Sequence, residues 1–235
     1  MGEQPADWLV AIDLQHVFAD ASSEWRAPRF ASVLDPVRAL IARYRPRVVL
    51  TRFVAPASPD GAWVDYYRRF PWALQPSRSQ LWDLVGGLEG EVLTTTTFGK
   101  WGPSLQAIVG PASRLVLAGV STDCCVLSTA LAAADAGVAV RVVREACAGA
   151  DDAAHERALE AMAMYAPLVE VVSLDDALRG QPGGVARRPR RAPAGAIPSR
   201  AIPSRDDLDQ DGRPGPSEGE DPAPTGPAPW SGGRR

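Results

Sequence analysis

Short apolar runs recur along most of the chain, and segments with helical spacing separate them. The apolar runs are residues 8–13, 47–53, 91–95, 113–119, 138–143 and 168–172. The segments in which apolar residues repeat every three to four positions are 32–45, 102–109, 122–136, 151–165 and 174–178. Residues 54–90 follow neither period and are expected to be irregular. Alternating strands and helices predict an α/β fold, a three-layer (αβα), doubly wound sheet of six mainly parallel strands.

The alternation of apolar runs and helical segments stops near Gly180. Residues 181–235 are rich in Pro, Gly, Ser, Arg and Asp and contain the tandem repeat AIPSR-AIPSR. Such a segment buries too little apolar area to offset the entropy of ordering it. We therefore expect a domain at residues 1–180 and a disordered tail at 181–235. The basic cluster at 187–191 is consistent with contact to RNA or an acidic partner, but a solvated tail is the favoured interpretation.

Bulk composition narrows the function classes. Hydrophobic residues make up 46% of the chain and the formal net charge is −3, so we expect no nucleic-acid partner. No apolar run approaches the length of a membrane span, and the N-terminus lacks the features of a signal peptide. The three cysteines show no disulfide spacing, which favours a reducing compartment. The expectation is a soluble, cytoplasmic protein without a membrane partner.

Polar residues of chemical interest follow the predicted strands. Asp13, Arg52, Lys100 and the Cys124–Cys125 pair each lie just past a strand end. The carboxyl ends of parallel strands share one edge of the sheet, where active sites gather. Lys100 is also the single lysine, whereas every other cationic side chain is an arginine. Lysine is a compact charge with a tunable pKa, so this position is a candidate for chemistry.

Cys125 is predicted to lie in the first turn of a helix. That position favours the thiolate and predicts a lowered pKa, and the free N–H groups there can face an oxyanion. The alternative is a buried cysteine that packs as a small apolar residue. We expect Cys124 to be packing and Cys147 to be buried and inert. The sequence has no GxGxxG motif and no P-loop, so we expect no organic cofactor.

The runs GVSTDCCV at 119–126 and DLQHVF at 13–18, with the lone Lys100 between them, resemble the isochorismatase-like cysteine hydrolase family. The resemblance covers roughly residues 7–175. It implies that Asp13 is the general base, Lys100 stabilises charge and Cys125 attacks a carbonyl to form a thioester. It also implies an oxyanion hole from the N–H groups of Ser121 and Cys125, and a cis peptide between Val120 and Ser121.

The resemblance further implies a substrate class. Similar proteins include nicotinamidases, N-carbamoylsarcosine amidohydrolases, ureidoacrylate amidohydrolases and biuret hydrolases. Nicotinamidases of this kind bind a metal through an Asp and two His after the second strand, but residues 51–60 contain no histidine. The chain has only His16, a candidate to line the pocket, and His155, expected at the surface. We therefore expect no metal and rank nicotinamide below other amides.

Several residues near the strand ends are candidates to contact a small, planar substrate, with hydrophobic packing as the alternative for the aromatic ones. These candidates are Gln15, Phe18, Arg52, Phe53, Trp63, Tyr66 and Trp101. Arg52 suits either a substrate carboxylate or an internal ion pair.

The sequence thus predicts a cysteine-dependent amidohydrolase that cleaves a non-peptide C–N bond of a small amide, ureido or carbamoyl compound. Two alternatives stay open: a non-catalytic small-molecule binding or interaction protein on the same scaffold, and an isochorismate-type hydrolase. A redox role for the adjacent cysteines is less favoured, because a C-x-x-C spacing is missing. The resemblance also implies a homo-oligomer, either a dimer or a tetramer.

Overall fold

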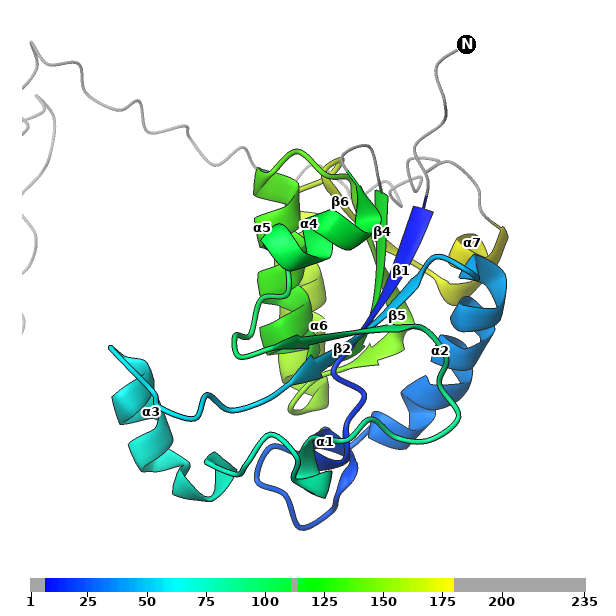
Figure 1. The fold of residues 1–235 in the computed structure, drawn as a ribbon. Coiled ribbons are helices and arrows are strands. Elements are labelled where there is room, and N and C mark those ends of the chain that lie inside the picture. The colour runs from blue at the N-terminus through cyan, green and yellow to red at the C-terminus, as the bar shows by residue number, and fades with distance from the viewer. Residues whose placement is uncertain (1–6, 111–113, 180–235) are drawn as a thin grey trace, which may run out of the picture. The chain divides into compact units, whose positions relative to one another are not determined.

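The structure, a computed structural model, describes residues 7–110 and 114–179 (Figure 1). These residues form a six-stranded sheet in the order β3-β2-β1-β4-β5-β6, and every neighbouring pair of strands is parallel. The strands are β1 (Asp7–Ile12), β2 (Val48–Phe53), β3 (Glu91–Thr95), β4 (Arg114–Val120), β5 (Val140–Ala148) and β6 (Val169–Val172). The predicted α/β class and parallel sheet are confirmed. The predicted tail at 181–235 lies outside the described residues.

Helices cover both faces of the sheet (Figure 1). The helices are α1 (His16–Ala19), α2 (Phe30–Tyr44), α3 (Trp63–Arg69), α4 (Pro103–Val109), α5 (Leu127–Asp135), α6 (Asp152–Ala163) and α7 (Leu174–Arg179). Side chains alternate along β1, since Leu9 and Ala11 pack in the layer of α2 and α7 while Val10 and Ile12 pack in the layer of α4, α5 and α6. This alternation follows from the two-residue period of a strand and explains why β1 is apolar throughout.

Helix α5 ends, and helix α6 begins, where the sequence predicts. Gly137 follows α5 with a φ of +83°, which suits the left-handed residue that closes a helix. Asp151 precedes α6, and its carboxylate accepts a hydrogen bond of 2.6 Å from the N–H of Ala154. This bond satisfies one of the free donors at the helix N-terminus.

The structure differs from the sequence prediction in segment 54–90 and at the end of β5. The segment 54–90 contains α3 and two 3₁₀ turns, η1 (Pro71–Ala73) and η2 (Gln80–Trp82), where irregular structure was expected. Strand β5 continues to Ala148 rather than ending at 143, because the small buried residues after Glu145 pair again with β4. The polar Arg144 and Glu145 interrupt the apolar run and hide this continuation in the sequence.

Gly119 allows β1 and β4 to lie close at the end that carries the site. Its φ is +115°, and a Cβ atom there would lie 2.1 Å from the carbonyl oxygen of Ile12. A side chain is therefore excluded by contact as well as by conformation. The residues that follow Ile12 and Gly119 are brought together at this edge of the sheet.

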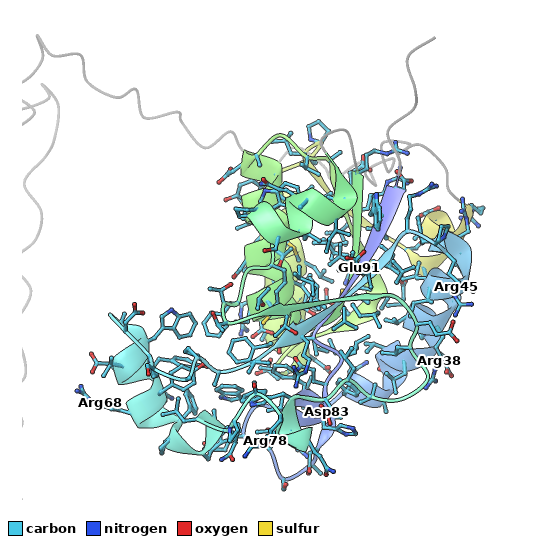
Figure 2. All side chains as sticks on the ribbon, in the orientation of Figure 1. Arg38, Arg45, Arg68, Arg78, Asp83 and Glu91 are labelled. Atoms are coloured by element: carbon cyan, nitrogen blue, oxygen red, sulfur yellow. The ribbon has the colours of Figure 1, made fainter. Side chains whose placement is uncertain are left out.

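Several arginines on the outer surface of the domain form ion pairs. Arg38, Arg45 and Arg68 point away from the layers (Figure 2), and each pairs with a nearby carboxylate. Among the described helices, none is long and apolar enough to span a bilayer.

Candidate active site

Asp13 lies directly after β1 and is fully buried. Its φ of +49° is in the left-handed region, where Asp is tolerated better than most residues. The hydroxyl of Thr51, at the centre of β2, donates to Asp13 Oδ1 at 2.7 Å and accepts from the Asp13 N–H at 3.1 Å. Thr51 is also fully buried. One neighbouring side chain thus fixes both the backbone and the carboxylate of Asp13.

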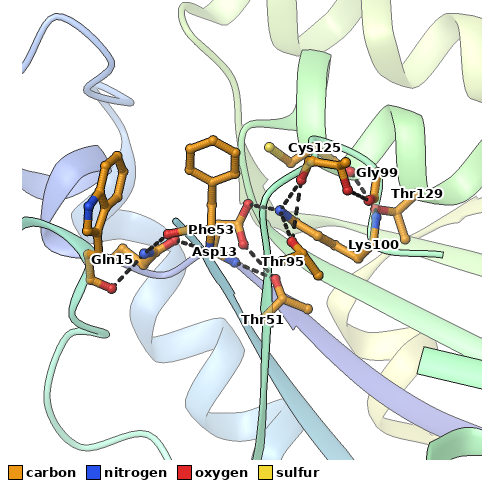
Figure 3. Close-up of polar contacts among 11 residues, drawn as sticks. Asp13, Gln15, Thr51, Phe53, Thr95, Gly99, Lys100, Cys125 and Thr129 are labelled. Atoms are coloured by element: carbon orange, nitrogen blue, oxygen red, sulfur yellow. Dashed lines mark hydrogen bonds and ion pairs between the residues drawn. The ribbon is translucent and has the colours of Figure 1, made fainter. Parts of the chain in front are cut away.

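Lys100 extends from the loop after β3 to the same place (Figure 3). Its Nζ lies 2.8 Å from Asp13 Oδ2, 2.9 Å from the Thr97 carbonyl and 3.2 Å from the Thr95 hydroxyl. Three acceptors therefore match the three protons of the ammonium group. The Phe53 ring centroid lies 5.2 Å from Nζ, within the range of a cation–π contact. Both partners of the ion pair have fully buried side chains.

Cys125 lies in the helical segment that follows β4, beside the Asp13–Lys100 ion pair. Residues Thr122–Val126 form a π-helical turn, η3, where a regular α-helix was expected. The Ser121 carbonyl accepts from the N–H groups of Cys124 and Val126, at 3.2 and 3.1 Å. The peptide bond between Val120 and Ser121 is cis, as the resemblance implies.

Two contacts hold this turn against α6 and the loop that precedes it. The Thr122 hydroxyl lies 2.8 Å from Nδ1 of His155, and Asp123 Oδ1 accepts from the Ala150 N–H at 3.0 Å. His155 was expected at the surface, but its side chain is only 15% exposed. Burial lowers the pKa of His155, so its ring is neutral at neutral pH.

The side chains of Cys124 and Cys125 are neighbours, and each affects the ionisation of the other. The Cys124 thiol, burial and the Asp13 carboxylate raise the pKa of Cys125 well above its usual range, and Lys100 opposes them. The Cys125 thiol lowers the pKa of Cys124, which is partly exposed. The expected lowered pKa of Cys125 is thus corrected: burial and the neighbouring thiol outweigh the helix terminus, and Cys125 rests as a protonated thiol.

A cavity of about 230 Å³ opens over Cys125. Aromatic rings form much of its wall, and charged side chains are present as well. The lining residues are Phe18, Glu24, Trp25, Arg26, Phe53, Tyr66, Phe98, Ser121, Asp123, Cys124, Cys125 and Ala150. The sequence-predicted residues Phe18, Phe53 and Tyr66 thus lie in this wall. Cys124, expected as packing, lies there too.

Other expected substrate contacts lie elsewhere. Gln15 is fully buried, and its amide group is occupied by the backbone of Phe53 and the carbonyl of Trp82. Arg52 donates to the carbonyls of Trp82 and Ser77 and lies 3.6 Å from Asp83, so it makes the internal contacts that the sequence left as an alternative. Both side chains therefore hold the segment around η2 against β2.

Three further candidates also lie outside the cavity wall. Trp63 packs against Phe98 with ring centroids 4.9 Å apart, so it supports a wall residue instead of forming the wall. Trp101 packs with the layer of α4, α5 and α6. His16 is exposed. His16 and Trp101 follow strand ends and Trp63 lies in α3, and none of the three lines the cavity over Cys125.

Sequence reasoning missed Trp25, which holds the cavity wall together. Its ring makes contacts with the rings of Phe53, Tyr66, Phe70, Trp72 and Trp82 at centroid distances from 4.8 to 6.4 Å. The available signal was a large aromatic residue inside the polar run SSEWRAP, shortly after the first strand. An isolated aromatic in such a run indicates a loop anchored to the core.

Solved structures with the same fold include known hydrolases. A cysteine hydrolase from Pseudomonas syringae pv. phaseolicola superposes with a TM-score of 0.66 at 14% identity, covering 74% of this chain and 91% of that one. A nicotinamidase/pyrazinamidase from Bacillus subtilis gives 0.58 at 20%, covering 71% and 98%. A pyrazinamidase from Pyrococcus horikoshii in complex with zinc gives 0.59 at 23%, covering 72% and 99%. At these identities the likeness establishes a shared fold.

The structure of the Pyrococcus protein contains zinc, an ion that proteins usually bind through four ligands. Within residues 7–110 and 114–179, no group of three or more His, Cys, Asp or Glu side chains is arranged to hold a metal ion. The segment after β2, from Val54 to Asp60, carries no histidine. The residues present therefore do not fit a zinc ion of the usual nitrogen and sulfur coordination.

The family model for the isochorismatase domain matches residues 7–176. No curated protein matches the sequence significantly. The match covers the whole sheet and each residue of the site described above. The chain therefore belongs to the isochorismatase family, whose members are hydrolases.

Proposed function

We propose that this protein is a cysteine amidohydrolase that cleaves a C–N bond of a small amide, ureido or carbamoyl compound through a thioester. The observation that supports it most directly is a buried Asp13–Lys100 ion pair next to a cysteine in a cavity wall. Burying two charges is costly, and such pairs are often no more stable than apolar replacements. A chemical role gives a reason for keeping this pair.

The resting protonation state supports a base-assisted attack. Cys125 keeps its proton, so attack requires a neighbouring base. Asp13 Oδ1 accepts from Thr51, whereas Oδ2 has, among the described residues, only the ion pair with Lys100. Oδ2 therefore has an acceptor position left for the thiol proton. Lys100 stabilises the carboxylate and the negative charge that develops beside it.

The bond changes then follow in two halves. Cys125 Sγ forms a bond to the substrate carbonyl carbon as its proton passes to Asp13. The C–N bond breaks, the nitrogen takes this proton from Asp13, and ammonia or an amine leaves. Water attacks the thioester, Asp13 accepts a water proton, and this proton returns to the sulfur as the C–S bond breaks. The N–H groups of Ser121 and Cys125 are proposed to bind the carbonyl oxygen throughout.

The cavity sets the size and character of the substrate. About 230 Å³ is below the usual range for drug-sized ligands, so the acyl group must be small. The rings of Phe18, Trp25 and Phe53 suit a flat or apolar group, and the exposed Glu24 and Arg26 give the same cavity polar contacts.

The test is turnover combined with capture of the intermediate. The full chain is incubated with a panel of simple carboxamides, ureido acids and carbamoyl amines, and ammonia release is measured. With a responding substrate, acid-quenched enzyme should carry the acyl mass on Cys125. Cys125→Ala should abolish both signals, whereas Cys147→Ala, which removes a buried thiol outside the cavity, should keep them. Ammonia release by Cys125→Ala at the wild-type rate would refute the mechanism, and binding without turnover would favour the non-catalytic alternative.

We also infer a cytoplasmic homo-oligomer, either a dimer or a tetramer. The three cysteines are free thiols, which fits a reducing compartment. Met164, Tyr165 and Leu168 are 84, 45 and 47% exposed within five positions of each other and form an apolar surface suited to a contact between copies. Light scattering should give two or four times the chain mass of 25.0 kDa, and a single-chain mass would contradict this inference.

A further inference from the structure

Thr129 contacts two of the three proposed catalytic residues through a single hydroxyl. It lies in α5 and is fully buried. Its Oγ1 accepts a hydrogen bond of 2.9 Å from the N–H of Lys100 and donates one of 2.7 Å to the carbonyl of Cys125 (Figure 3). Because a hydroxyl has one proton and the carbonyl can only accept, the direction of both bonds is fixed.

Helix structure by itself explains only one of these bonds. A threonine in a helix commonly donates to the carbonyl four residues earlier, and Cys125 is that residue. The bond from Lys100 is different, because it joins positions 29 residues apart in the sequence. Gly99 also lies against α5, since a Cβ atom there would be 3.5 Å from Ser128. The loop that carries Lys100 is therefore seated on the helix that follows the nucleophile.

We propose that Thr129 is a positioning residue that fixes the distance between the Lys100 ammonium and the Cys125 sulfur. The inference rests on the proposed function, since it assigns Thr129 a part in that reaction. Lys100 in turn contacts Oδ2 of Asp13, a carboxylate that Thr51 holds through Oδ1 from the other side, so the Thr129 hydroxyl sets the placement of the cation between the base and the nucleophile. Small errors in such placement are costly, and about 1 Å of misplacement can reduce a rate about 100-fold.

The test compares Thr129→Val, which keeps the shape and loses the hydroxyl, with Thr129→Ser, which keeps the hydroxyl and loses the methyl group. The probe is p-nitrophenyl acetate, and the readout is the burst of p-nitrophenolate as the acetyl group passes to Cys125 with loss of the ester C–O bond. We expect the Val variant to lower the acylation rate by about tenfold to 100-fold, with KM changed less than about threefold. We expect the Ser variant to stay within about threefold of the wild type.

A second readout separates positioning from general stability. The pH profile of the acylation rate, measured from the p-nitrophenolate burst between about pH 5 and 10, reports how Lys100 and Asp13 assist the attack of the thiol. We expect its pH midpoint to move in Thr129→Val and to stay in Thr129→Ser, with Cys147→Ala as the control variant. Loss of stability without a change in geometry would leave this midpoint unchanged.

The outcomes decide between the proposals. Equal acylation rates in the Val and Ser variants, or an unmoved midpoint in Thr129→Val, would overturn the positioning role. If the Val variant does not fold, Thr129→Ser carries the test by itself, because a folded Ser variant slowed tenfold or more would also overturn it. Failure of the proposed function is distinguished by Cys125→Ala: an unchanged burst in that variant refutes the nucleophile, whatever Thr129 does.

Discussion

Replacing Lys100 by methionine tests what the buried ion pair contributes. Its charged atoms are 2.8 Å apart and both side chains are fully buried. At that distance the Coulomb attraction is about 6 kcal/mol for an effective dielectric constant of about 20, and desolvation offsets most of it. Lys100→Met removes the attraction but leaves the Asp13 carboxylate buried. We expect the free energy of unfolding to fall by about 3–5 kcal/mol.

The matched variant is the double substitution Asp13→Asn with Lys100→Met. Asparagine tolerates the φ of +49° at position 13 and can still accept from the Thr51 hydroxyl. With no buried charge left, the double variant should recover at least about 2 kcal/mol relative to Lys100→Met. The second substitution therefore stabilises the protein, although it removes another native group.

Urea unfolding of the full chain, followed by tryptophan fluorescence, measures the stability of the wild type, Lys100→Met and the double variant. The slope with denaturant should be the same for each variant, so that the midpoints report stability. If the double variant were as unstable as Lys100→Met or less stable, the loss would come from packing of the lysine stem. The argument that an unpaired carboxylate causes the instability would then fail.

Three further predictions follow from other contacts. Gly119→Ala should prevent folding, since its Cβ would meet a carbonyl oxygen at 2.1 Å, whereas Gly102→Ala, where no atom lies within 4 Å, should fold; equal soluble yields would contradict this. Burial raises the pKa of Cys147 from 9.0 to about 12, so the unfolded thiol ionises first and stability should fall by about 1.4 kcal/mol per pH unit between these values. Cys147→Ala should lose less stability than the wild type between pH 8 and 10, and parallel curves would refute the assignment. The pKa of His155 is lowered, so its contribution is present above its ordinary pKa of 6.5 and lost as pH falls below it. The wild type should therefore lose more unfolding free energy than His155→Gln between pH 7 and 5, and an equal loss would show that the contact with Thr122 is insensitive to protonation.

The fold could be predicted from the sequence because the signals for buried strands and for helix ends are both local. A strand buried on both faces is apolar throughout, as in Trp8–Ile12, and the glycine after α5 marks where that helix ends. Strand β5 shows the limit of this reasoning. Its polar pair at Arg144 and Glu145 breaks the apolar run, although pairing with β4 resumes two residues later.

The sequence predicted only part of the arrangement of the site residues. Parallel strands bring their carboxyl ends to one edge, so Asp13, Lys100 and Cys125 were expected to meet there. The orientation of each side chain depends on neighbours far away in sequence, and local patterns do not contain them. Gln15 was expected to contact substrate, but the backbone of Phe53 occupies its amide group. The charge state of Cys125 depends in the same way on three-dimensional neighbours.

The adjacent thiols have a practical consequence for chemical probes. Electrophiles that select for sulfur anions should favour Cys124, whose pKa is lowered, over Cys125, whose pKa is raised. A profiling experiment with such a reagent would therefore highlight the neighbour and overlook the attacking group. An inhibitor designed for this protein should resemble the acyl substrate, so that Asp13 can deprotonate Cys125 as the warhead binds.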